Sequence, residues 1–178
     1  MRLVMHSIPY EFKIINYMDK AGNDYLKSVN PISKIPVLIA DDQIIYDSRV
    51  IYNFLSKKYQ WNQLSLHDEN IISAIDGAMD SSINLFLLQR GGLDLNSANS
   101  FIERQQKRIE DLFNFLSPWV KLQDAKNNNH WNFPTISLYS YLDWLQLRKM
   151  SDFSQHPEMK NFLYDFQNAP GIQETKAV

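Results

Sequence analysis

The sequence contains no cysteine, which excludes disulfide bonds, thiolate metal sites and cysteine nucleophiles. Only five glycines and seven prolines are present, too few for the many tight turns of an all-β sandwich. Histidines are also scarce and far apart, and no two of them have the i,i+3 or i,i+4 spacing of a helical metal site. They are His6, His67, His130 and His156. We therefore expect no bound metal.

Neither sign of charge is in excess, because 18 basic residues are interleaved with 20 acidic ones. Such a distribution provides no basic face for nucleic acid. No apolar run approaches the roughly 18 residues that span a bilayer, and the first residues lack the long apolar stretch of a signal peptide. We expect a cytoplasmic protein that binds neither nucleic acid nor membranes.

The first sixty residues combine short strands with short helices. Three apolar runs rich in β-forming residues predict strands, over residues 8–15, 35–40 and 44–46. The polar residues between the last two runs predict a hairpin turn. A helix should begin at Asp47 and Ser48, with Ser48 as its N-cap. Its buried face should carry Val50, Ile51, Phe54 and Leu55.

The pattern changes beyond a linker at residues 61–66. From there the apolar residues recur at helical spacing in successive stripes, which predicts a helical bundle. The second stripe should stop at Ser117 and Pro118, because proline breaks a helix. The sequence therefore predicts two domains, an α/β domain over residues 1–60 and an all-helical domain over residues 67–178.

Residues 30–51 carry the most informative chemistry. The bond between Ile35 and Pro36, just before a buried strand, is a place where a cis peptide could be built in. Proline also leaves the N–H and C=O groups of Ile35 for an extended ligand. The hairpin then returns to Asp47 and Ser48, where the start of a helix favours a carboxylate and Asp47 can take an ammonium group. A ligand that carries a carboxylate and an ammonium group on one carbon, and that also has a peptide backbone, would be bound at three points. These points are the start of the helix, Asp47 and the backbone of Ile35.

This linked motif resembles the glutathione-site signature of the glutathione transferase superfamily. The shared features are an Asn-Pro pair, a Lys-Ile-Pro-Val-Leu strand, an acidic turn and an Asp-Ser pair that opens a helix. The resemblance implies a thioredoxin-like amino-terminal domain followed by a helical bundle, with glutathione as co-substrate. It implies that Ile35 pairs its backbone with the cysteinyl unit and that Pro36 is a cis-proline. It also implies that Asp47 and Ser48 hold the γ-glutamyl group, and that Lys34 lies near the glycyl carboxylate.

The second half of the chain resembles the same family. Residues 140–148 are similar to the central helix of its carboxy-terminal domain, and residues 162–171 to its closing helix. Asn132 to Thr135 occupies the place of the family's capping box, where Thr135 replaces the usual aspartate. A threonine can still hydrogen-bond the cap, more weakly than a carboxylate. We therefore expect a cost in stability and no loss of function.

The sequence departs from the family at its start. A family member opens with a strand, a turn that carries the catalytic Ser, Tyr or Cys, and a helix. Here residues 2–6 resemble the tail of that helix, so we expect the first strand and the catalytic turn to be missing from this chain and encoded upstream. An alternative alignment makes residues 1–4 the first strand and Ser7 the catalytic residue, and it deletes the second strand. The catalytic residue stays unknown.

Two functions are compatible with the resemblance. One is an enzyme that conjugates glutathione to small electrophiles, or uses it to reduce them, as in detoxification. The other is a non-catalytic binding or scaffold protein of the same fold, so whether the chain is an enzyme stays open. The resemblance also implies a two-fold homodimer, formed by the small domain of one chain against the helical domain of the other. Leu85 and Leu88, in a long helix over residues 68–90, should contribute to it.

Overall fold

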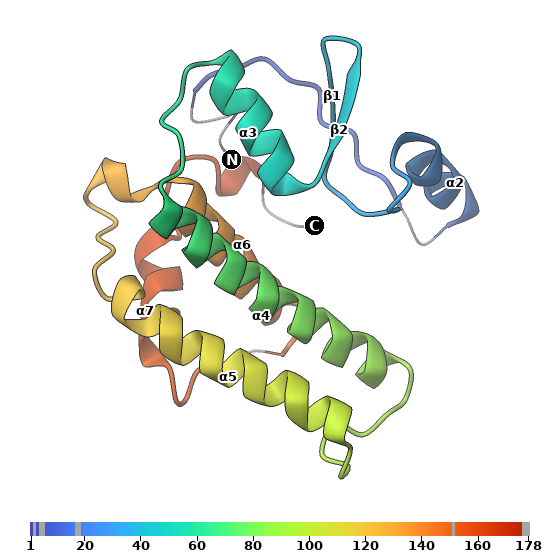
Figure 1. Cartoon of the computed structure of the whole chain (residues 1–178), viewed down its shortest axis with the longest axis vertical. Helices are drawn as coiled ribbons and strands as arrows, with labels where there is room; N and C mark the ends of the chain where they lie inside the picture. The colour runs from blue at the N-terminus through green and yellow to red at the C-terminus, as the bar shows by residue number, and fades with distance from the viewer. Residues whose placement is uncertain (2, 4–5, 17–18, 151, 176–178) are drawn as a thin grey trace. The chain divides into compact units, whose positions relative to one another are not determined.

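The computed structural model describes residues 1, 3, 6–16, 19–150 and 152–175. The chain divides into two compact units, one formed by Pro9–Leu64 and the other by Met1–Ile8 together with Ser65–Val178. The first unit contains a hairpin and two described helices, and the second is a helical bundle (Figure 1). The chain therefore has a small α/β unit with a reduced sheet, followed by helices, as the resemblance implies.

The small unit is built around a hairpin. Its elements are α2 (Lys20–Val29), β1 (Val37–Ala40), β2 (Gln43–Tyr46) and α3 (Ser48–Lys58). Strands β1 and β2 are antiparallel. The two turn residues between them, Asp41 and Asp42, have φ angles of 52° and 60°. Positive φ at both central residues is typical of the type I′ turn that suits a two-residue hairpin, so the predicted hairpin is confirmed.

Residues 9–16 do not form the strand that was predicted over residues 8–15. The sheet of the described residues contains β1 and β2 alone. Phe12 and Ile14 are 74% and 73% exposed, so the β-forming residues of this segment do not cover a core. A strand needs a neighbour that pairs with its N–H and C=O groups. Alternating apolar residues indicate β propensity but do not supply that neighbour.

The buried face of α3 agrees with the prediction at Leu55 but differs from it at Val50 and Tyr52. Tyr52 and Leu55 are buried, whereas Val50 is 53% exposed. The Tyr52 hydroxyl donates a hydrogen bond to the C=O of Asn62 at 3.1 Å, and its ring centroid lies 6.1 Å from that of Trp61. Contacts with the segment that follows α3 therefore decide which face of this helix turns inward. Helical periodicity alone identified Leu55 but not Tyr52.

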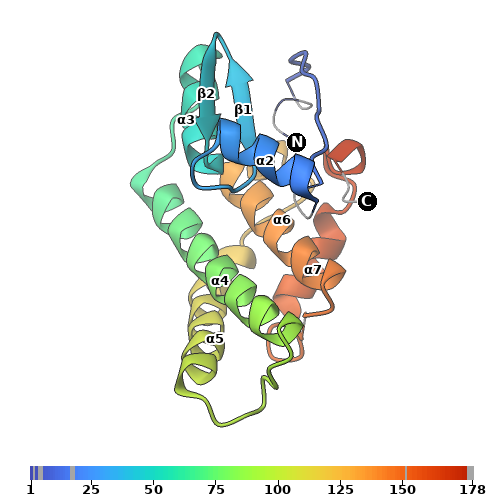
Figure 2. The ribbon, with the colours of Figure 1, turned by 90° about the vertical axis from the view of Figure 1, so that its right-hand side faces the viewer.

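Beyond Ser65, the described residues of the helical unit form four helices and two short 3₁₀ turns. They are α4 (Leu66–Arg90), α5 (Ser100–Val120), η1 (Asn128–His130), α6 (Phe133–Leu147), α7 (Pro157–Phe166) and η2 (Gln173–Thr175). Helices α4 and α5 lie side by side, and α6 packs against both α4 and α7 (Figures 1 and 2). Leu138, Tyr141 and Leu142 of α6 have no exposed surface, which places α6 at the centre of the core.

Two predictions about this unit are wrong. Pro118 does not end α5, which continues to Val120. A proline in the last turn removes only one helical hydrogen bond, so the packing of α5 outweighs its effect. Leu85, expected at a dimer surface, is 5% exposed and belongs to the core.

Helix α4 is the one helix in the described part of the chain that is long and apolar enough to cross a membrane by those two criteria. Many of its apolar residues are nevertheless buried inside the unit. Among them are Ile71, Ile72, Ala74, Ile75 and Ala78. Helix α4 is therefore a core helix of the bundle.

The start of α6 confirms that Thr135 completes a capping box. The Thr135 N–H donates to Asn132 Oδ1 at 3.3 Å, and the Asn132 N–H donates to Thr135 Oγ1 at 2.9 Å. The Thr135 hydroxyl also donates to the C=O of His130 at 2.6 Å. A carboxylate could not make this last bond, because it only accepts. Threonine therefore joins the cap to η1 as well as closing it.

Candidate functional site

Asp47 is the N-cap of α3, the role that was predicted for Ser48. Its Oδ1 accepts hydrogen bonds from the N–H groups of Arg49 and Val50 at 2.9 and 3.3 Å. Its C=O accepts the first helical bond, from the N–H of Ile51 at 2.9 Å. Ser48 becomes the first residue of the helix. Aspartate and serine are equally good N-caps, so the sequence Asp-Ser could not decide between them.

The backbone of Asp47 is strained. Its φ and ψ angles are 76° and 130°, a conformation that costs a residue with a side chain about 1–3 kcal/mol and is frequent at ligand sites. Asp47 and Ser48 are both exposed. Ser48 donates no hydrogen bond to another described residue. The start of α3 therefore presents a carboxylate, a hydroxyl and a backbone donor to solvent.

Asn30 fixes the turn that leads to the second half of the site. It is 1% exposed, its Nδ2 donates to the C=O of Lys34 at 2.6 Å, and its Oδ1 accepts from the N–H of Ile32 at 2.9 Å. Its C=O accepts from the N–H of Ser33 at 2.9 Å. Sequence reasoning included Asn30 in the Asn-Pro pair of the motif but assigned its side chain no hydrogen bonds, although an amide side chain at a helix end can both donate and accept in this way.

The turn fixed by Asn30 is followed by an exposed stretch of backbone at residues 34–36. The Ile35–Pro36 peptide bond is cis, as the resemblance implies. The Ile35 side chain is 59% exposed, and neither its N–H nor its C=O bonds to another residue in the part of the chain that the structure describes. Lys34 is exposed too. An extended ligand can therefore reach the backbone of Ile35 and the ammonium group of Lys34.

The hairpin brings the two halves of the site to the same end. Val37 is opposite Tyr46 in the last pair of the ladder, so Pro36 and Asp47 are the next residues outward on the two strands. Opposed Cα atoms in an antiparallel pair lie about 4.5–5.5 Å apart, whereas a tripeptide spans about 10 Å. One peptide ligand can therefore contact both halves. Helix α3 lies beside the hairpin (Figure 2).

Ser7 lies in the helical unit, whereas the five candidate binding residues lie in the small unit. Leu3 is helical, and the N–H of Ile8 donates to the C=O of Leu3 at 2.9 Å, with Ser7 at a φ of 50°. A bond of this span across a residue with positive φ is the Schellman ending of a helix. Leu3 therefore does not form the strand that the alternative alignment requires, and Arg2 and Val4 lie outside the described residues.

The candidate site offers one carboxylate, one ammonium group, one hydroxyl and backbone amides. This set matches a zwitterionic peptide by charge and by hydrogen bonds. The five residues Lys34, Ile35, Pro36, Asp47 and Ser48 include no thiol or imidazole that could act as a nucleophile or base. No group of three or more metal-ligating side chains is found among the described residues.

Sequence comparison links the small unit to a known domain. A family model described as "Glutathione S-transferase, N-terminal domain" matches residues 1–63. A curated protein of Caenorhabditis elegans, "Probable maleylacetoacetate isomerase", is 28% identical over 57 residues, which are 32% of this chain and 27% of that protein. The match therefore spans about a quarter of the length of the curated relative.

Solved structures share the fold over most of the chain. A glutathione S-transferase of Methylobacillus flagellatus with glutathione bound has a TM-score of 0.81 at 19% identity, covering 99% of this chain and 91% of that one. One of Methylobacterium radiotolerans, in complex with glutathione sulfonate, has a TM-score of 0.79 at 18% identity and coverages of 97% and 85%. A glutathione transferase family member of Pseudomonas fluorescens with bound glutathione has a TM-score of 0.72 at 20% identity and coverages of 98% and 87%. Together they establish the fold.

Proposed function

We propose that this chain, whose residues 1–63 match the model of the glutathione S-transferase amino-terminal domain, binds glutathione at the end of the β1–β2 hairpin and transfers it to small electrophiles or uses it to reduce them. The observation that carries the proposal is the hairpin register, which sets the exposed backbone of Ile35 beside the start of α3 at Asp47 and Ser48. The glutathione and glutathione sulfonate bound to structures of the same fold support it.

Each part of glutathione has a partner in this proposal. The α-carboxylate of the γ-glutamyl group binds the N–H and hydroxyl of Ser48, where the dipole of α3 favours an anion. Its ammonium group binds the carboxylate of Asp47. The backbone of the cysteinyl unit pairs with the N–H and C=O of Ile35, which precedes the cis-proline Pro36. The ammonium group of Lys34 binds the glycyl carboxylate.

Chemistry on the thiol needs one more group. The thiolate is the nucleophile, and an enzyme must lower the thiol pKa of bound glutathione with a donor or a positive charge near the sulfur. None of the five binding residues is assigned to the sulfur, and the catalytic residue stays unknown, with Ser7 as the candidate named from the sequence. This observation favours a second candidate function, a glutathione-binding or scaffold protein without turnover.

We propose further that the protein is a cytoplasmic homodimer. Glutathione is the main thiol of the cytosol, which supports the location. Exposed apolar side chains on α5 support a second copy as partner, since Phe101 is 48% and Phe115 is 55% exposed. The mass of a single chain, measured by light scattering at micromolar concentration, would contradict the dimer.

The binding site is tested by calorimetric titration of glutathione into the full chain and two variants, Asp47→Asn and Ser48→Ala. Asparagine still caps α3 but cannot pair with an ammonium ion. A hydrogen bond to a charged group contributes about 1.5–3 kcal/mol, so each variant should raise the Kd about 10- to 100-fold.

Asp42→Asn is the matched control, because this exposed aspartate lies in the turn at the opposite end of the same hairpin. Its Kd should equal that of the parent chain. Equal affinities of the parent and Asp47→Asn would remove Asp47 from the site. Turnover of a generic electrophile by a chain that binds glutathione would distinguish the enzyme from the binding protein.

A further inference from the structure

The segment of residues 9–16 in the small unit combines free backbone groups with exposed apolar side chains. It forms no helix, turn or bend and leads to α2 (Figure 1). Tyr10, Phe12 and Ile14 are 44%, 74% and 73% exposed. None of the backbone N–H and C=O groups of residues 10–15 bonds to another residue in the described part of the chain. The segment therefore offers both hydrogen bonds and apolar surface to a partner.

The side chains of this segment alternate in character. In an extended chain successive side chains point to opposite faces, so Tyr10, Phe12 and Ile14 share one face, and Glu11 and Lys13 share the other. An exposed strand without a neighbour is a template for pairing with another chain. A second strand would supply the missing backbone partners and place its own apolar side chains beside the exposed ones.

The segment is complementary to a second copy of itself. When two copies run antiparallel about Phe12, the two Phe12 side chains lie opposite each other, and Tyr10 lies opposite Ile14. Glu11 then lies opposite Lys13 of the second copy, on both sides of the centre. Opposed apolar pairs and opposite charges each stabilise an antiparallel pair. We propose that this segment binds the same segment of a second copy of the chain in this register, as a two-stranded antiparallel ribbon.

Charge and pattern disfavour the neighbouring registers. A shift by one residue sets the apolar face of one copy against the polar face of the other. A shift by two residues centres the ribbon on Glu11 in one direction and on Lys13 in the other, so that like charges meet. The register centred on Phe12 avoids both conflicts.

Pro9 selects the edge that carries the hydrogen bonds. Alternate residues of a strand direct their N–H and C=O groups to the same edge, and proline has no N–H. The edge of Tyr10, Phe12 and Ile14 contains no proline, so these residues form the hydrogen-bonded pairs. Pro9 then lies opposite Ile15 in a non-bonded pair, where a missing N–H costs nothing.

The two charged side chains are available for this contact. Glu11 makes no hydrogen bond or ion pair with another described residue. The ammonium group of Lys13 lies over the ring of Tyr25 on α2, 3.7 Å from the ring centroid. An aromatic ring attracts one side of an ammonium group, and the remaining N–H groups can donate to a carboxylate. The contact with Tyr25 therefore does not exclude Glu11 of the second copy.

This contact joins small unit to small unit and does not require glutathione. It is separate from the α5 surface that supports the proposed homodimer, so the two proposals have different tests. A chain that is dimeric by light scattering but fails the tests below loses this contact alone.

Disulfide crosslinking tests the register, because the chain has no cysteine of its own. In Phe12→Cys the two new side chains lie on opposed Cα atoms about 5.5 Å apart, within the range of a disulfide. In Ile14→Cys, at a position that is equally exposed, they lie four residues apart along the ribbon, or about 13 Å. Under mild oxidation Phe12→Cys should therefore crosslink with itself, whereas Ile14→Cys should not.

A mixture of Tyr10→Cys and Ile14→Cys chains keeps Phe12 in place. These two positions are opposed in the proposed register, so the two chains should crosslink with each other and neither should crosslink with itself. Self-crosslinking of Ile14→Cys as readily as of Phe12→Cys overturns the proposal. The absence of a crosslink in both Phe12→Cys and the mixture also overturns it.

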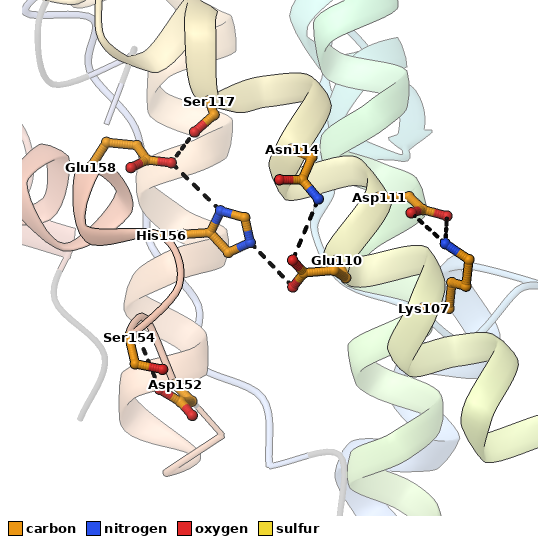
Figure 3. A network of polar contacts seen from close by, with 9 residues as sticks. All are labelled: Lys107, Glu110, Asp111, Asn114, Ser117, Asp152, Ser154, His156 and Glu158. Carbon is orange, nitrogen blue, oxygen red and sulfur yellow. Dashed lines mark hydrogen bonds and ion pairs between the residues drawn. The ribbon is translucent and has the colours of Figure 1, made fainter.

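Charge reversal in the Phe12→Cys chain tests the ion pairs. Lys13→Glu sets carboxylates opposite each other and should lower the crosslinked yield about 10-fold. Adding Glu11→Lys restores opposite charges and should recover the yield. Lys107→Glu is the matched control, because this exposed lysine belongs to the helical unit and pairs with Asp111 at 2.8 Å (Figure 3). Equal yields in all of these variants overturn the register.

Hydrogen exchange of the unmodified chain tests the ribbon without any substitution. Between micromolar and millimolar concentrations of the chain, the amides of Tyr10, Phe12 and Ile14 should become protected by about 10-fold or more. The amides of Glu11 and Lys13 face the other edge and should not change. Exchange of the Tyr10, Phe12 and Ile14 amides that is equally fast at both concentrations overturns the proposal.

Discussion

Replacing Thr135 with valine should destabilise the helical unit by about 2 kcal/mol. The change removes the hydroxyl but keeps the shape of a side chain that has no exposed surface. It leaves the N–H of Asn132 and the C=O of His130 without the partner that now lies 2.9 and 2.6 Å away. A buried polar group without a partner costs about 1–3 kcal/mol. Asn132 and His130 are half-buried, so water can partly replace the lost hydrogen bonds. The cost of the two unpaired groups together should therefore stay near the middle of that range.

Urea unfolding followed by circular dichroism measures this effect. With an m-value of about 2 kcal/mol per molar, the midpoint of Thr135→Val should fall by about 1 M while m stays constant. Thr135→Ser keeps the hydroxyl and should recover most of the loss. Ser140→Ala is the control, since it removes an exposed hydroxyl that bonds within the same helix and should change little. A valine variant as stable as the parent would refute the assignment of the cap.

Three further perturbations have defined outcomes. Gly22→Ala should lower the thermal midpoint of the small unit, because the new Cβ would lie 2.0 Å from the C=O oxygen of Asn16; an unchanged midpoint would contradict that close approach. Asn30→Ala should weaken glutathione binding measured by calorimetry, since it removes both side-chain bonds that fix the turn before Ile35; an unchanged Kd would separate that turn from the site. Burial raises the pKa of Tyr141 above its ordinary value, against the smaller opposite effect of its hydrogen bond with Ser82. The folded state therefore keeps a proton that the unfolded state loses near pH 10, so stability should fall as the pH rises above that value, and less so in Tyr141→Phe.

Local sequence patterns correctly predicted those secondary-structure elements whose conformation depends mainly on their own residues. The hairpin follows from two polar turn residues between apolar runs, and α6 follows from a capping box and a long apolar stripe. The strand predicted over residues 8–15 failed because pairing depends on a neighbouring strand, which propensity cannot provide. The prediction for the inward face of α3 was right at Leu55 but missed Tyr52 for a similar reason, since Tyr52 contacts Trp61 and Asn62 beyond the end of the helix.

The sequence predicted which residues belong to the candidate site, but it did not predict the hairpin register, the Asp47 cap or the Asn30 hydrogen bonds that arrange them. The sequence indicated Ile35 and the Asp-Ser pair, and the register of the hairpin shows why they share one end of it. The cap formed by Asp47, with its positive φ, could not be read from the residue types, because serine caps a helix equally well. The side-chain hydrogen bonds of Asn30 were not predicted, because they are made only once the turn before Ile35 exists.

The central claim is that glutathione binds at the end of the β1–β2 hairpin, and chemical-shift mapping of the backbone amides during a glutathione titration tests it most directly. Saturable shifts are expected at the amides of Ile35 and Ser48, on the two halves of the site, with none at Asp42 in the turn at the opposite end. Binding that leaves the amides of Ile35 and Ser48 unshifted, or no binding at millimolar glutathione, would contradict the account.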